Sequence, residues 1–365
     1  MKAVSSLLLC VGAVSAAAMF AHAQTVTDVS LKTEPAKATI VADASATVSA
    51  VSEASTMPEA INAPIVRPID TMSRAAAVYG TYQGDVSTVR NKPFSTAKDI
   101  ETAVTSLGGQ DSEQLSRGWL AYSVLVASQS DKFRDAVREV AAEYGKDRVL
   151  LAIRRDNSFA TQLYGSDDAV KAAMTALDKD SQRINTAASY VKEQAYSLQS
   201  AGWAKSKVGG RKQSIIADLG TGRSVDDALL TALASDEGDI ALNHAGKMGA
   251  PSLWEGVQKA AQTIRFPTLT GGSFGQQVEQ KSAARADLAH RINVMAAYRL
   301  LGFDGEGPNQ VQMSLADPLS KRCVVKAQLN LKQCVAAVHQ QHELPFCISE
   351  HALKEVSSCI DNIVE

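Results

Sequence analysis

The sequence predicts an all-α protein: a multi-helix bundle that contains one long heptad-patterned helix and ends in a disulfide-stapled helical hairpin. Apolar residues recur at three- and four-residue spacing through residues 71–315, with helix-capping signals between the runs. The two-residue alternation typical of half-buried strands is nearly absent. Four cysteines lie within residues 316–365, on two further stretches of helical spacing. These three observations predict the fold class.

The strongest helical pattern extends from Ser166 to Gln199. Aliphatic residues occupy every seventh position and mostly small residues follow four positions later, which is an a/d heptad pattern typical of a coiled coil. The resulting seam consists of Val170, Met174, Leu177, Ile184, Ala188, Val191, Ala195 and Leu198. A helix of this length is about 50 Å long. Because small d residues allow close approach, we expect the seam to be buried against another helix of the same chain or of a second subunit.

The chain begins with a pattern typical of export. Residues Met1–Ala23 resemble a secretory signal peptide, with Lys2 at the start, an apolar run from Leu7 and a small-x-small end at Ala21–Ala23. Residues 24–70 are rich in Ala, Ser, Thr and Pro and contain no aromatic residue, so we expect a flexible tether. We therefore expect an exported protein, periplasmic if the host has an outer membrane and otherwise secreted.

Charge and hydropathy limit the classes of partner. Attachment of a lipid to Cys10, as in a lipoprotein, is an alternative to a simple secretory signal peptide. Lipoprotein processing, however, requires a small residue at the position of Leu9. Loss of the signal peptide removes Lys2 and no acid, which leaves 36 basic and 39 acidic side chains. Without a basic stripe we expect no nucleic-acid partner. The mature chain has no run of about 20 apolar residues, so we expect no transmembrane span.

Residues 71–315 form the expected helical body. Thr96 and Asp99 make a capping box for a helix that Gly108 closes, and Asp111 begins the next helix. Further helices are expected from Phe133 to Tyr144, from Asp147 to Tyr164, after the capping boxes Ser224/Asp227 and Ser252/Glu255, and from Val278 to Leu301. The Gly-rich segments Gly202–Lys212 and Phe266–Gly275 are expected loops. The first is where the body could be subdivided.

Residues 316–365 are expected to form a four-cysteine hairpin. Asp317 and Pro318 begin a helix that extends to about Gln340, and Ser349 is the expected cap of the second helix after a turn at His342–Pro345. Partners in an antiparallel hairpin lie equally far from the turn, and only the nested pairing shares one centre. That pairing is Cys323–Cys359 and Cys334–Cys347, with each bond worth about 3 kcal/mol.

This layout is similar to the twin-cysteine hairpins of the coiled-coil-helix family. The similarity is one of geometry over fewer than fifty residues, because ten and eleven residues separate the cysteines here rather than nine. Zinc held by these cysteines with His339, His342 or His351 is the rival interpretation. Zinc motifs place ligands two to four residues apart, so the spacing favours disulfides and we expect no metal.

Short catalytic motifs are weak in this chain. Gly271–Gly275 matches G-x-S-x-G, with Asp317 and His339 downstream, but lacks the strand-turn-helix context that exposes the serine. His244 and His290 are expected to be packing or surface residues rather than catalysts. The tryptophans could form a sugar-binding shelf, although core anchors are the favoured role: Trp119, Trp203 and Trp254. No phosphate-binding, zinc-protease or calcium-loop motif is present, so no cofactor is expected.

The function hypothesis that follows is an exported, non-enzymatic helical scaffold that acts through a protein partner or self-association. The alternative is a secreted hydrolase of cell-wall or other sugar polymers, with an Asp or Glu as general acid. A bundle that carries a small apolar ligand is a third interpretation. A cleft with two acids, one of raised pKa, favours the enzyme, whereas a long apolar surface favours the binder.

Overall fold

The computed structural model describes residues 68–249, 285–303 and 308–364. The first half of these residues forms α1 Thr71–Asn91, α2 Ala97–Gly108, α3 Ser112–Ala127, α4 Asp131–Tyr144, α5 Lys146–Arg155, α6 Phe159–Gln162 and α7 Ser166–Ser197. Next come the 3₁₀ turns η1 Leu198–Ser200 and η2 Gly202–Lys205, then α8 Arg211–Asp218, α9 Asp227–Leu233, α10 Asp236–Met248, α12 Ala286–Leu300 and α13 Pro308–Ser314. The chain ends with α14 Pro318–Ala337, η3 Gln341–Glu343, α15 Leu344–Cys347, the π-helical segment η4 Ile348–Lys354 and α16 Glu355–Asp361.

The all-α class is confirmed over these residues, which contain no strand and one isolated bridge between Lys207 and Gln340. The expected signal peptide and almost all of the tether lie outside the described residues. So do the capping box at Ser252/Glu255 and the motif at Gly271–Gly275.

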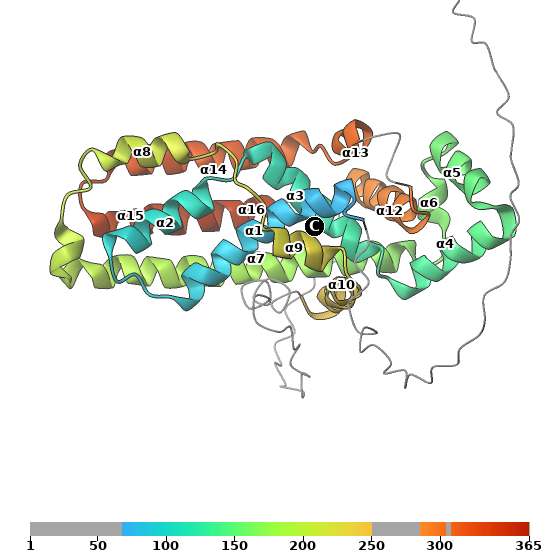
Figure 1. Ribbon diagram of the computed structural model, residues 1–365, viewed down its shortest axis with the longest axis horizontal. Coiled ribbons are helices and arrows are strands. Elements are labelled where there is room, and N and C mark those ends of the chain that lie inside the picture. The colour runs from blue at the N-terminus through green and yellow to red at the C-terminus, as the bar shows by residue number, and fades with distance from the viewer. Residues whose placement is uncertain (1–67, 250–284, 304–307, 365) are drawn as a thin grey trace, which may run out of the picture. The chain divides into compact units, whose positions relative to one another are not determined.

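The long heptad helix is present as α7, which continues without a break through Ser181 (Figure 1). Every residue of the predicted seam is buried, and α7 packs on α1, α3, α10, η4 and α16. Ser357 and Ser349 come close enough to donate hydroxyl hydrogen bonds to the Ser181 and Ala188 carbonyls, at 3.1 and 2.8 Å. Small residues at d positions thus allow the approach of helices of the same chain, and this seam is occupied internally.

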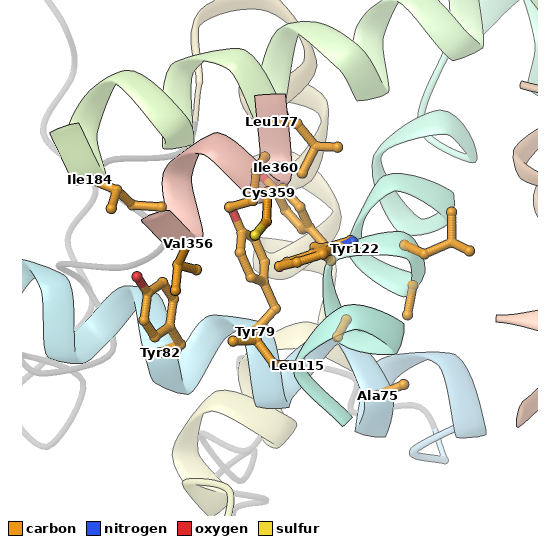
Figure 2. Packing of buried hydrophobic residues seen from close by; sticks show 14 of the residues in the cluster. Ala75, Tyr79, Tyr82, Leu115, Tyr122, Leu177, Ile184, Val356, Cys359 and Ile360 are labelled. Atoms are coloured by element: carbon orange, nitrogen blue, oxygen red, sulfur yellow. The ribbon is translucent and has the colours of Figure 1, made fainter. Parts of the chain in front are cut away.

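The centre of the bundle is lined by aromatic side chains from α1 and α3. Tyr79, Tyr82 and Tyr122 are fully buried between these helices, α7 and α16, as Figure 2 shows. At Gly118 a Cβ atom would lie 2.9 Å from both the Ala75 carbonyl oxygen and the Tyr79 nitrogen. The two helix backbones therefore touch at this glycine. Helix α1 was not anticipated from the sequence.

A buried polar network crosses this core beside the seam. Arg183 and Asp180 of α7 form an ion pair at 3.8 Å, and the Tyr79 hydroxyl donates to Asp180 at 3.1 Å. Gln83 links Tyr79 to the Arg183 guanidinium. Burial, followed by the Asp180 charge, raises the pKa of Tyr79 well above its usual value, so the hydroxyl stays protonated. The network pairs the charges that α7 buries.

Several helix boundaries differ from the sequence predictions, and the expected loop Gly202–Lys212 contains the 3₁₀ turn η2 and the start of α8. The helix expected over Asp147–Tyr164 is divided into α5 and α6, because the Asp156 carboxylate accepts hydrogen bonds from the Ser158 backbone and hydroxyl and stabilises a turn. The cap of α9 is Asp226, which accepts from the Ala228 nitrogen, rather than Ser224. Ser349 caps no helix, since the second arm of the hairpin already begins at Leu344.

The described residues all belong to one unit of the chain, Ala60–Glu365, and the other unit, Met1–Glu59, lies outside them. Helices on both sides of Gly202–Lys212 pack together, with α7 against α10 and α16 and with α3 against α12 and α14. The second arm of the hairpin, formed by α15, η4 and α16, contacts both α14 and α7. The hairpin is thus anchored to the body through its second arm and through contacts of α14 with α3 and α8.

Candidate interaction surface

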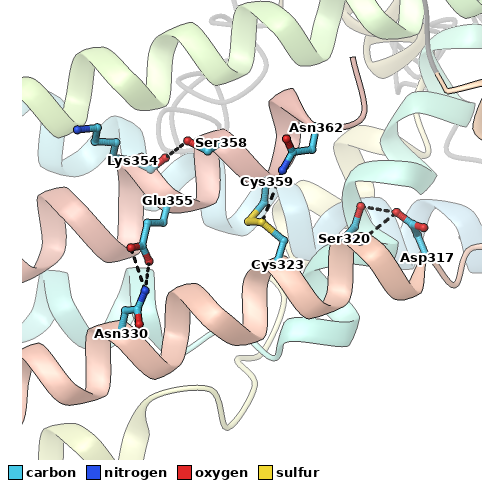
Figure 3. The surroundings of a disulfide bond; sticks show 9 residues. All are labelled: Asp317, Ser320, Cys323, Asn330, Lys354, Glu355, Ser358, Cys359 and Asn362. Carbon is cyan, nitrogen blue, oxygen red and sulfur yellow. Dashed lines mark hydrogen bonds between the residues drawn. A yellow bond between two sulfur atoms is a disulfide. The ribbon is translucent and has the colours of Figure 1, made fainter. Parts of the chain in front are cut away.

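The C-terminal hairpin is stapled at two points. Disulfides join Cys323 to Cys359 and Cys334 to Cys347, with Cα–Cα distances of 5.6 and 5.7 Å, which is the nested arrangement. Between them the Asn330 amide donates to both Glu355 carboxylate oxygens, at 3.0 and 3.1 Å (Figure 3). The two arms are therefore fixed relative to each other along most of their length.

Helix α14 is held on its inner face and on both flanks. Its N-cap, Asp317, accepts from the Ser320 nitrogen and pairs with Arg285 at 2.9 Å. One flank faces the disulfides, and on the other Lys321 pairs with Glu113 of α3 at 2.5 Å. The inner face is fully buried and consists of Ser320, Val324, Ala327, Leu331 and Val335.

The remaining face of α14 is open to solvent, and we call it the outer α14 face. It consists of Pro318, Leu319, Arg322, Val325, Lys326, Leu329, Gln333 and Ala336. Leu319, Val325 and Leu329 are 50%, 45% and 53% exposed. Leu319 lies outside the buried stripe of this helix, which runs through Val324 and Val335.

The charge of this face is one-sided. The twenty residues of α14 contain four basic side chains and no acid. Lys321 is paired with Glu113, whereas Arg322 and Lys326 form no ion pair within the described part of the chain. Both lie among the exposed aliphatic residues, so the surface combines exposed apolar side chains with positive charges that no described acid pairs. The absence of acids from α14 was visible in the sequence and is the signal that could have identified the face.

The basic segment Gly202–Lys212 lies against the end of α14. Val208 donates its backbone N–H to the His339 carbonyl at 3.1 Å, and Gln341 donates to the Ser206 carbonyl at 3.1 Å. The Lys212 ammonium donates to the Val338 carbonyl at 2.6 Å and so caps the C-terminus of α14. These contacts add exposed Lys205 and Lys207 to the positive end of the hairpin.

An apolar hollow of about 370 Å³ adjoins the same end of the hairpin. Ala337 and Val338 line it from the end of α14, and Tyr196 and Phe346 line it from α7 and α15. Tyr196 is 57% exposed and Phe346 39% exposed. Because Ala337 follows Ala336 of the outer α14 face, this hollow extends the exposed apolar surface around the hairpin end.

Two carboxylates with opposite pKa shifts line a smaller cavity, of about 200 Å³, beside α1 and α2. Burial raises the pKa of Asp85 to about 6, against the effect of its ion pair with Arg223. Hydrogen bonds from Lys92 and Thr96 lower the pKa of Asp99 to about 2. Asp99 is also the capping-box residue of α2. Among the described residues, Asp85 and Asp99 form a pair of acids whose pKa values differ enough for one to act as the acid and the other as the base.

The other residues considered from sequence do not converge on a site. Trp119 is fully buried in the core and Trp203 packs at its edge, while Trp254 lies outside the described residues. Asp317 caps α14, and His339 lies near the opposite end of that helix. All four C-terminal cysteines are in disulfides, and the described residues contain no group of three His, Cys, Asp or Glu side chains placed to hold a metal ion.

Comparison of the chain with protein-family models, with curated proteins and with solved structures returns no match. Among the helices that the structure describes, none has the length and apolar character required to cross a bilayer.

Proposed function

We propose that this protein is an exported, non-enzymatic helical interaction protein that binds an acidic amphipathic helix of a partner protein on the outer α14 face. The observation that carries the proposal is the combination, on one rigid face, of exposed aliphatic residues with two cations that form no ion pair within the described residues, and with no acid on the helix. Two disulfides support export, because such bonds persist in oxidising compartments. The seam of α7 is not the proposed surface, since it is buried internally.

The spacing along α14 favours a helical partner. Pro318, Val325, Leu329 and Ala336 follow one another at intervals of seven, four and seven residues, which a second helix can match over several turns. Burial of an exposed Leu or Val side chain contributes about 1.5–3 kcal/mol. Arg322 and Lys326 favour acidic flanks on the partner and disfavour a second copy of the same basic face.

The test is site-specific photo-crosslinking in the exporting cells, with benzoylphenylalanine at Leu329 and, as a matched control, at Leu151. Leu151 is 45% exposed on α5, outside the hairpin. We expect one protein adduct from position 329 and none from position 151, with the crosslinked peptide mapping to an acidic amphipathic helix. R322E/K326E should reduce the adduct at least tenfold, whereas K146E/R148E on α5 should leave it unchanged.

Two results oppose the proposal. One is the absence of an adduct at position 329 when the protein is exported and folded. The other is an adduct on a basic or non-helical segment that persists in R322E/K326E. Binding of the synthetic partner segment to the purified protein, measured by calorimetry, then separates direct contact from proximity in the cell.

A second candidate function, hydrolysis of cell-wall or other sugar polymers, is supported by Asp85 and Asp99. An acid with a pKa of about 6 that lines the same cavity as an ionised acid is what a general acid with a base or nucleophile requires. The wild-type protein and D85N are compared for release of reducing ends from peptidoglycan and glucan between pH 4 and 7. Activity in the wild type that D85N lacks supports hydrolysis, and an inactive wild type removes this candidate.

A further inference from the structure

A third cavity, of about 650 Å³, lies where five parts of the chain meet, and no residue of α14 lines it. The start of α1, the α3–α4 turn, α4, the α9–α10 region and the end of α12 all contribute to its wall. Gln129 and Asn243 hold two of these parts together, because the Asn243 amide donates to the Gln129 carbonyl at 2.9 Å. A cavity of this volume is in the range that holds small organic ligands.

Three arginines line this cavity: Arg134 and Arg138, one turn apart on α4, and Arg299 on α12. Arg299 is paired with Asp70. Arg134 pairs with exposed Asp131 at 2.6 Å, and its buried Nε lies 3.9 Å from the Asp135 carboxylate but makes no hydrogen bond within the described residues. Arg138 forms no ion pair there. Each guanidinium has five N–H donors, so α4 keeps donors available to an oxyanion.

The two carboxylates in the wall are already engaged. Asp70 accepts from the Ser73 nitrogen at 2.5 Å as the N-cap of α1, in addition to its pair with Arg299. Asp239 accepts from the Gln129 amide at 2.8 Å. Both carboxylates therefore interact with groups of the chain itself. The arginine side chains of α4 supply the positive charge of the cavity.

Part of the cavity lining is apolar. Ile240, on α10, is 67% exposed, and it lines the cavity together with Leu300 and Pro68. From this arrangement we propose that the cavity binds a small amphipathic organic anion. Its phosphate or carboxylate head contacts Arg134 and Arg138, and its short apolar part packs against Ile240 and Leu300. This site is separate from the outer α14 face and does not depend on the function proposed for it.

The test is isothermal titration calorimetry of the full chain with hexyl phosphate, hexanoate, inorganic phosphate and hexanol. We expect hexyl phosphate or hexanoate to bind at least tenfold more tightly than inorganic phosphate or hexanol, because neither of the last two carries both an anionic head and an apolar chain. A preference between hexyl phosphate and hexanoate identifies the head group. R138Q should weaken binding at least threefold, and R134Q/R138Q at least tenfold. I240S should weaken hexyl phosphate but not inorganic phosphate.

Arg148→Gln is the matched control, since Arg148 is exposed on α5 and does not line the cavity. R138Q removes no ion pair of the described structure, so it tests the proposal even if the double variant fails to fold. Absence of binding to the wild type, or equal weakening by R148Q and R138Q, overturns the proposal.

Discussion

At the scale of single residues, Asp85 is a carboxyl group whose ionisation opposes folding. Its pKa is about 6 in the folded protein because burial disfavours the charged form more than Arg223 favours it. Below pH 4 the group is protonated in both the folded and unfolded states. Above pH 6 the folded state must bury a carboxylate that the unfolded state leaves in water. The stabilising effect of the raised pKa is therefore present at low pH and is lost as the pH rises through 6.

We accordingly predict that the free energy of unfolding of the wild type falls between pH 4 and pH 7 by on the order of 3 kcal/mol more than that of D85N. Urea denaturation at each pH measures this difference. The two proteins are compared by how their unfolding free energy changes with pH, and not by its absolute value, because D85N also loses the Arg223 ion pair at every pH. Asp135→Asn, at an exposed carboxylate, should keep the wild-type slope. Parallel curves for wild type and D85N contradict the prediction.

A second prediction at this scale concerns two glycines with different surroundings. Gly118→Ala should destabilise the protein by about 1–3 kcal/mol, because the new methyl group meets the α1 backbone, which cannot move aside. Gly84→Ala in α1 should instead stabilise it by about 1 kcal/mol, since no atom lies within 4 Å of its Cβ position and alanine favours helix. Thermal unfolding of both variants tests the pair. Equal shifts in Tm mean that the helices are not in contact at Gly118.

At the scale of elements, the hairpin combines a helix pair with two covalent links of different span. Cys323–Cys359 closes a sequence separation of 36 residues and Cys334–Cys347 one of 13. A longer closed loop removes more entropy from the unfolded chain. The outer α14 face can be presented to a partner at low entropic cost because both ends of this hairpin are fixed.

We predict that C323A/C359A loses about 4 kcal/mol of stability and C334A/C347A about 3 kcal/mol, from the loop-entropy relation. Chemical denaturation of the two variants under non-reducing conditions gives both values. The wild type in reducing buffer, where both bonds open, should lose more than either variant. If C334A/C347A were the more damaging change, strain or packing rather than loop entropy would dominate.

At the scale of the whole molecule, the described helices are interleaved across the chain. Helix α7 packs on α1 and α3, which precede it, and on α10 and α16, which follow the Gly202–Lys212 segment. A domain boundary at this segment would require that few contacts join the helices before it to the helices after it. Their shared core instead favours a single cooperative unit.

We therefore predict one unfolding transition for the helical unit. In a W254F variant, tryptophan fluorescence reports on buried Trp119 and partly buried Trp203, which precede and follow α7 in the sequence, while circular dichroism reports on all helices. The two signals should give the same denaturation midpoint. Replacement of Ile184, at the centre of the seam, by Asp should lower that midpoint for both probes together. Two separate transitions would place a subdomain boundary within the body.

Local patterns were enough to predict several elements of this fold. The capping box at Thr96 and Asp99, the Asp111 cap and the Asp317–Pro318 start all mark observed helix ends, because a cap depends on residues within a few positions of it. The break between α5 and α6 was not predicted, although its cause, the turn stabilised by Asp156, is equally local and is harder to recognise in the sequence. Helix α1 escaped prediction because its small residues, Ala75 to Ala77, give little apolar periodicity.

The all-α class, the heptad of α7 and the paired hairpin follow from the amino-acid sequence because each rests on periodicity or symmetry within one continuous stretch. The tertiary structure alone decided which neighbours bury the seam and which face of α14 remains exposed. It also brought Asp85 towards Asp99, and the α4 arginines towards Ile240. These outcomes depend on contacts between segments far apart in the chain, where burial and charge pairing are properties of the packed molecule rather than of any local pattern.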